Sequence, residues 1–180
     1  MNLPNKLTLI RIFLVPVIVA LLLLGEVGSW LYYTAGILFI LASITDFLDG
    51  YLARKNNWIT NFGKFMDPLA DKILVCSVLI CLITKGLSPA WAVILIIARE
   101  FAISGFRLIA VEKGVVLAAS NLAKRKTNMQ TLWVIYLLFP FAWDSWKLVA
   151  DILMVLAVIL TIWSFADYIV KNRSVLKEQK

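Results

Sequence analysis

The sequence predicts an all-α integral membrane protein with six transmembrane helices and both termini in the cytoplasm. Of its 180 residues, 62% are hydrophobic and 16% are charged, and the mean hydropathy is +0.88. This composition is typical of polytopic membrane proteins, so we expect one membrane domain over residues 1–180 and no separate soluble domain. In so apolar a chain, the net charge of +7 indicates membrane lipids or phosphorylated substrates as partners and no nucleic acid.

Six apolar stretches account for the predicted helices, because each approaches the roughly 20 residues that cross a bilayer. The fifth is the weakest, since its start is basic and polar and Pro140 is expected to end or kink it. The stretches are residues 7–24, 30–49, 67–84, 90–110, 129–141 with its flanks, and 148–169.

Basic residues are concentrated on one side of these stretches. The connections after the first, third and fifth stretches contain only Lys85 and Lys147 as cations. By the positive-inside rule both termini are therefore cytoplasmic, with residues 1–6 as an interfacial segment and residues 170–180 as a tail. The cations on the cytoplasmic side include Lys6, Arg11, Arg54, Lys55, Lys64, Lys113, Lys124, Arg125, Lys126, Lys171, Arg173, Lys177 and Lys180.

Four aspartates lie at the predicted cytoplasmic boundary of the second and third stretches. Asp46 and Asp49 are three residues apart, and Asp67 and Asp71 are four apart, so each pair shares one helical face. Carboxylates near lipid are unfavourable without compensation and normally mark a site. Four converging negative charges require cations, and oxygen ligands suit Mg²⁺ or Mn²⁺.

The aspartates belong to a longer string, Asp46-x-x-Asp49-Gly50-x-x-Ala53-Arg54, followed after eight residues by Gly63-x-x-x-Asp67-x-x-x-Asp71. This string resembles the signature of the CDP-alcohol phosphotransferases, a family of integral membrane enzymes that make phospholipids. Every position of the family pattern is filled, and the six-helix architecture of the family agrees with the apolar stretches.

The resemblance implies roles for the residues of the string. Asp46, Asp49 and Asp67 would bind two divalent cations (Mg²⁺ or Mn²⁺), and Asp71 would be a ligand and the general base. We expect Gly63 to allow a tight turn before the third helix. The contacts to CDP-diacylglycerol are expected from Asn5, Thr8, Gly50, Arg54 and Thr60.

Three outer motifs resemble family members that use sn-glycerol 3-phosphate as the acceptor. The implied reaction transfers the phosphatidyl group from CDP-diacylglycerol to glycerol 3-phosphate, giving phosphatidylglycerophosphate and CMP. Arg107, Lys124 and Lys126 are the residues expected to bind the acceptor phosphate, and Glu100 is expected to form a structural salt bridge with a basic residue, orienting Arg107. The motifs are Asn5-x-x-Thr8-x-x-Arg11, Ala98-Arg99-Glu100 to Gly105-Phe106-Arg107, and Lys124-x-Lys126-Thr127-x-x-Gln130.

Other functions are compatible with parts of this pattern. The same chemistry could use serine, inositol phosphate or phosphatidylglycerol as acceptor. A divalent-cation transporter would need its carboxylates near the middle of the membrane, whereas these lie at one boundary. A non-catalytic scaffold would have no reason to keep all four aspartates. Family members commonly form homodimers, which the sequence neither supports nor contradicts.

Overall fold

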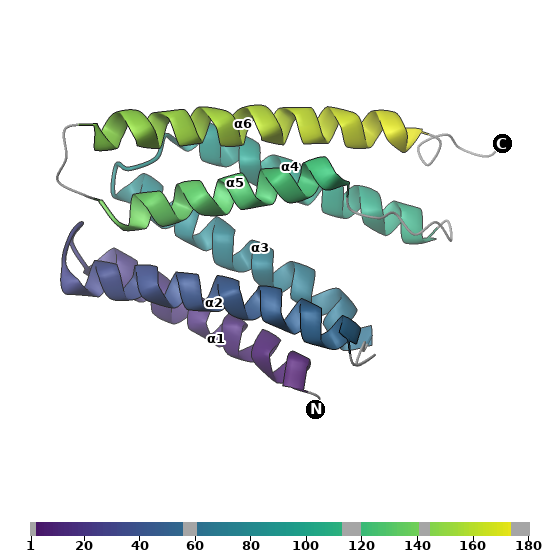
Figure 1. Ribbon diagram of the computed structural model, residues 1–180, viewed down its shortest axis with the longest axis horizontal. Coiled ribbons are helices and arrows are strands. Elements are labelled where there is room, and N and C mark those ends of the chain that lie inside the picture. The colour runs from purple at the N-terminus through teal and green to yellow at the C-terminus, as the bar shows by residue number, and fades with distance from the viewer. Residues whose placement is uncertain (1–2, 56–60, 113–119, 141–144, 174–180) are drawn as a thin grey trace. The chain divides into compact units, whose positions relative to one another are not determined.

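The described part of the chain contains six α-helices and no strand (Figure 1). The computed structural model describes residues 3–55, 61–112, 120–140 and 145–173, and it describes side chains at residues 6–45, 66–112, 120–140 and 145–173. The all-α prediction is confirmed. The helices are α1 (Leu3–Leu24), α2 (Trp30–Lys55), α3 (Asn61–Thr84), α4 (Ala90–Glu112), α5 (Asn121–Leu138) and α6 (Trp146–Lys171).

Each helix matches one predicted apolar stretch, but several helices are longer than predicted. Helix α3 begins at Asn61 and not at the predicted start, Asp67, so Gly63 lies inside this helix and the predicted tight turn there is wrong. Helix α5 begins at Asn121 instead of residue 129. The reason is physical: polar residues at these helix starts interrupt the apolar run without interrupting the helical hydrogen bonds.

Two segments in the described part of the chain are long and apolar enough to cross a membrane, Lys6–Leu24 and Trp146–Lys171. The shorter helical segment Trp30–Thr45 is also apolar. Pro16 lies inside α1, where the surrounding helices of a bundle tolerate it.

The contacts between helices divide the chain into two compact units. Unit 1 comprises Met1–Ser88 and Val134–Ala142, and unit 2 comprises Pro89–Trp133 and Trp143–Lys180. Helix α5 is therefore shared, with its last residues counted in unit 1.

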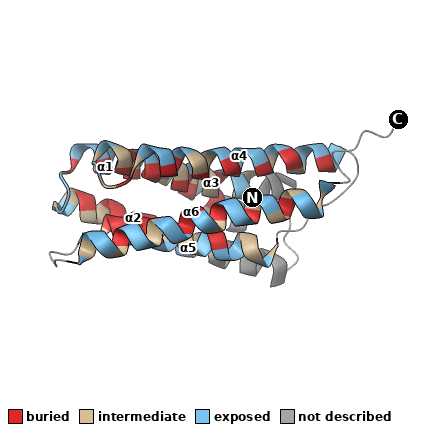
Figure 2. Cartoon of the chain, turned by 90° about the horizontal axis from the view of Figure 1, so that it is seen from above, coloured by how far each residue is buried: buried red, intermediate tan, exposed pale blue. Residues whose placement is uncertain are grey.

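In unit 1, α1 packs against both α2 and α3 (Figure 1). Buried residues recur every three or four positions along these helices, and Figure 2 colours the buried residues red. The end of α5 joins this core through Tyr32, whose hydroxyl donates a hydrogen bond of 3.0 Å to the Leu137 carbonyl. Gly36 permits the close approach, because a Cβ atom there would lie 2.9 Å from the Phe139 ring.

In unit 2, α4 packs against α6 through a face whose residues recur every three or four positions. The facing surface of α6 is rich in small side chains, which lets the two helices approach closely. The buried residues of α6 are Ala150, Ala157, Val158, Thr161, Ser164 and Tyr168.

Candidate active site

The four aspartates lie on two helices of unit 1 that are adjacent in the chain. Asp46 and Asp49 lie in the second half of α2, and Asp67 and Asp71 lie in the first half of α3. Figure 1 shows that α2 ends and α3 begins at the same end of this unit. The fold thus places both aspartate pairs on neighbouring helical segments. The side chains of Asp46, Asp49, Gly50 and Arg54 lie outside the described residues, as do the side chain of Asn5 and all of Thr60.

Asp67 is held by a hydrogen bond from α1. The Thr8 hydroxyl donates to Asp67 Oδ1 at 2.5 Å, and Thr8 is completely buried. Hydrogen bonds to a carboxylate are short and strong, so this contact fixes the position of the Asp67 side chain. Sequence reasoning assigned Thr8 to the nucleotide and missed this contact, because the two residues are 59 positions apart and no local pattern connects them.

Arg11 lies one helical turn after Thr8 and is almost completely buried, with 1% of its surface exposed. Its Nε donates a hydrogen bond of 3.3 Å to the carbonyl oxygen of Ala42. In an α-helix that carbonyl also accepts the backbone N–H of residue 46. Arg11 therefore brings a buried positive charge to the turn of α2 on which Asp46 lies.

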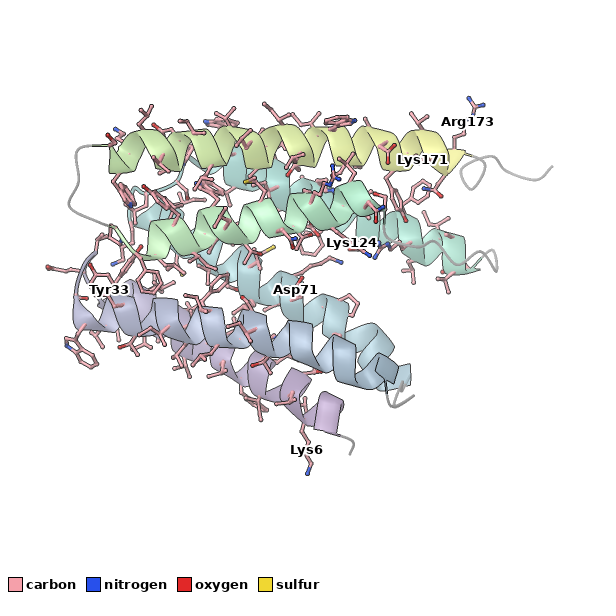
Figure 3. The ribbon with its side chains drawn as sticks, viewed as in Figure 1. Lys6, Tyr33, Asp71, Lys124, Lys171 and Arg173 are labelled. Carbon is pink, nitrogen blue, oxygen red and sulfur yellow. The ribbon has the colours of Figure 1, made fainter. Side chains whose placement is uncertain are left out.

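The chemistry of the described donors fits a hard divalent cation. Asp67 and Asp71 are half-buried carboxylates one turn apart on α3, and Figure 3 labels Asp71 on that helix. Within the side chains that the structure describes, no group of three or more histidine, cysteine or acidic residues could by itself hold a metal ion. Oxygen donors of this kind suit Mg²⁺ or Mn²⁺.

Unit 2 contains a buried ion cluster that connects its three helices. Glu100 of α4 pairs with Lys126 of α5 and with Arg99, whose Nη1 lies 3.1 Å from Glu100 Oε1. The Arg99 Nη2 group donates a hydrogen bond of 3.1 Å to Ser164 Oγ on α6. The predicted salt bridge of Glu100 is confirmed, with Arg99 and Lys126 as its partners, whereas its role in orienting Arg107 stays a prediction.

The three residues predicted to bind the acceptor phosphate have different surroundings. Lys126 is 1% exposed and lies in the ion cluster, whereas Lys124 is exposed at the start of α5 (Figure 3). Arg107 is half-buried, and its guanidinium carbon lies 5.9 Å from the centre of the Tyr168 ring.

Sequence reasoning missed two residues of this region, Ser164 and Tyr168. A signal for them exists: Thr161, Ser164 and Tyr168 are polar residues at spacings of three and four in the apolar helix α6. Such spacing predicts one shared face, and all three residues are buried.

An open groove of about 560 Å³ lies in unit 2 between the start of α5 and the end of α6. It contains no residue of the predicted site. The Lys171 ammonium in it lies 2.7 Å from Asp167 Oδ1. The lining residues are Ser120, Asn121, Leu122, Arg125, Trp163, Asp167 and Lys171.

Comparisons with known proteins agree with the signature in the sequence. A family model described as CDP-alcohol phosphatidyltransferase matches residues 1–163. The chain is 47% identical to the CDP-diacylglycerol–glycerol-3-phosphate 3-phosphatidyltransferase of Bacillus subtilis, over 98% of this chain and 97% of the relative. It is 36% identical to the protein of the same name from Escherichia coli K12, over 99% and 98% of the two chains. The protein of that name from Rickettsia bellii is 43% identical over 93% of each chain.

Proposed function

The chain belongs to the CDP-alcohol phosphatidyltransferase family, and on this premise we propose that it transfers a phosphatidyl group from CDP-diacylglycerol to sn-glycerol 3-phosphate. The products are phosphatidylglycerophosphate and CMP, so the protein is an enzyme of phospholipid biosynthesis. The observation that carries this proposal is the likeness to the Bacillus subtilis enzyme along nearly the whole of both chains.

The proposed donor site lies in unit 1. Asp46, Asp49, Asp67 and Asp71 hold two divalent cations, Mg²⁺ or Mn²⁺. When bound, the cations neutralise the diphosphate and stabilise charge on the departing phosphate. The hydrogen bond from Thr8 keeps Asp67 in place, and the buried charge of Arg11 reduces the repulsion among the carboxylates. The CDP moiety is bound by Asn5, Thr8, Gly50, Arg54 and Thr60.

The acceptor phosphate is bound by cations of unit 2. Arg107 offers a planar fork of N–H donors that matches two phosphate oxygens. Lys124 adds an exposed charge at the start of α5. Lys126 acts from within the ion cluster, where Glu100 fixes its position.

Asp71 removes the proton that the reaction releases. The C1 hydroxyl oxygen of glycerol 3-phosphate attacks the phosphorus atom nearer to the diacylglycerol. A new O–P bond forms while the bond from that phosphorus to the bridging oxygen of the diphosphate breaks, so CMP leaves with the bridging oxygen. The hydroxyl proton passes to a carboxylate oxygen of Asp71.

The protein works within a membrane. All six helices cross it, both termini lie in the cytoplasm, and the aspartates face the cytoplasmic side of the cell membrane, where glycerol 3-phosphate is available. The strong bias of basic residues toward one side supports this orientation. The protein forms homodimers, as is common in the family.

The test uses purified protein in detergent with CDP-diacylglycerol, Mg²⁺ or Mn²⁺, and labelled glycerol 3-phosphate. We expect metal-dependent formation of CMP and labelled phosphatidylglycerophosphate. Asp71→Asn keeps the size of the side chain but removes the base, so kcat should fall at least about a thousandfold. Asp151→Asn, at an exposed position of α6, is the matched control and should keep full activity.

Serine and inositol phosphate, supplied as competing acceptors, test the choice of acceptor. Release of CMP only with one of these would preserve the transfer chemistry and overturn glycerol 3-phosphate as the acceptor. No release of CMP with any acceptor would overturn the proposed reaction.

A further inference from the structure

The hydroxyl group of Tyr168 has no structural role that the described residues explain. Tyr168 is 2% exposed, and its Oη atom is buried without a hydrogen-bond partner among the described residues. A buried hydroxyl that gives up its water without gaining a partner lowers stability. Such a group in a folded protein indicates a missing ligand, water or ion.

Packing does not require this hydroxyl. The ring of Tyr168 lies in an apolar cluster with Ile103, Phe106 and Ala110 of α4. It meets the Phe106 ring edge to face, with ring centres 5.6 Å apart. Phenylalanine would fill the same space and make the same ring contact, so the cluster accounts for the ring and not for the oxygen.

The guanidinium of Arg107, which packs on the Tyr168 ring, is a second polar group with a buried atom that lacks a described partner. The Arg107 guanidinium is 5.9 Å from the ring centre of Tyr168, within the range of a cation–π contact. The Nε of Arg107 is also buried and has no hydrogen-bond partner among the described residues. The Tyr168 O–H and the Arg107 Nε–H are donors without a described acceptor on two side chains that pack together, and such donors are complementary to an oxyanion with several acceptor oxygens.

We propose that Tyr168 is a phosphate-binding residue: its hydroxyl donates to a non-bridging oxygen of a phosphate monoester that Arg107 also binds, and its ring holds the guanidinium in place. The inference rests on the proposed function, which supplies glycerol 3-phosphate as the monoester. It adds a neutral donor from α6 to a site otherwise made of cations from α4 and α5. A neutral donor contributes affinity and orientation without adding more like charge to the buried cluster.

Two substitutions separate the hydroxyl from the ring. Tyr168→Phe removes the donor and keeps the ring under Arg107, so KM for glycerol 3-phosphate should rise about tenfold, the effect of losing one hydrogen bond to a charged group. Its kcat and its KM for CDP-diacylglycerol should change little, and its thermal stability should be unchanged or higher. Tyr168→Leu also removes the aromatic ring that Arg107 contacts, so KM for glycerol 3-phosphate should rise further.

Tyr32→Phe is the matched control, because the Tyr32 hydroxyl is also buried but donates to the Leu137 carbonyl. This variant should lower the unfolding temperature and leave KM for glycerol 3-phosphate unchanged. A readout independent of turnover is the stabilisation of each protein by added glycerol 3-phosphate or inorganic phosphate, measured by thermal unfolding. Both anions should stabilise the wild-type protein, and both should do so less in Tyr168→Phe.

The outcomes distinguish this inference from the function on which it rests. If the wild-type enzyme is active and Tyr168→Phe keeps the wild-type KM for glycerol 3-phosphate, the proposed role of Tyr168 is wrong. The proposed reaction would still stand. A rise confined to KM for CDP-diacylglycerol would assign the hydroxyl to the donor phosphate and overturn the inference. A wild-type protein that forms no product with any acceptor would overturn the proposed function itself.

Discussion

Unit 1 and unit 2 each contain a half-buried carboxylate that accepts hydrogen bonds, but the two carboxylates have opposite kinds of partner. In unit 1, Asp67 accepts a hydrogen bond from a neutral hydroxyl, that of Thr8. In unit 2, Glu100 lies between two cations, Arg99 and Lys126. A neutral donor positions a carboxylate and leaves its negative charge for a ligand, whereas two cations more than neutralise it. This difference suits the cation-binding role that we propose for Asp67, whereas the ion pairs of Glu100 hold α4 and α5 together.

The largest expected effect is the loss of activity in Asp67→Asn. This substitution keeps the shape and the hydrogen bond from Thr8 but removes the negative charge, so transition-state stabilisation by bound cations should fall by about 4 kcal/mol, or about a thousandfold in kcat/KM. The rate of CMP release measures the effect. The unfolding temperature should not fall, because the substitution removes repulsion among carboxylates. A variant with normal activity would remove Asp67 from the site.

Glu100→Gln is expected to lower stability, whereas Asp67→Asn is expected to lower activity. Two buried cations would lose their counter-charge, so the free energy of unfolding should fall by about 3 kcal/mol. Chemical or thermal unfolding in detergent measures the loss. Glu26→Gln, at an exposed position between α1 and α2, controls for the general effect of removing a carboxylate and should be neutral. A stable Glu100→Gln protein with impaired turnover would contradict the structural role of Glu100.

The smallest of these effects is expected for Thr8→Val. Valine keeps the volume of threonine but cannot donate to Asp67, so the concentration of Mg²⁺ or Mn²⁺ that gives half-maximal activity should rise about tenfold. Thr34→Val is the matched control, since Thr34 is half-buried and its hydroxyl donates a hydrogen bond within its own helix to the Trp30 carbonyl. A rise in KM for CDP-diacylglycerol at unchanged metal dependence would instead make Thr8 a nucleotide contact.

The helix boundaries show where prediction from apolar stretches stops working. The run of apolar residues located α3 but placed its start at Asp67, because the residues before Asp67 are more polar. The structure continues the helix back to Asn61. Backbone hydrogen bonds decide where a helix begins, and a polar turn can satisfy them as well as an apolar one. Apolar length therefore predicts which segments are helical better than it predicts their ends.

The sequence by itself determined the helical class, the aspartate spacing and the family, because these depend on local composition and on residues close together in the chain. Only the tertiary structure brought Thr8 to Asp67 and Arg99 to Ser164, which are 59 and 65 positions apart. It also placed Arg107 over Tyr168. Such contacts depend on which helix faces meet, and many pairings bury similar apolar area. The choice among them comes from close packing and from the need to satisfy each buried polar group.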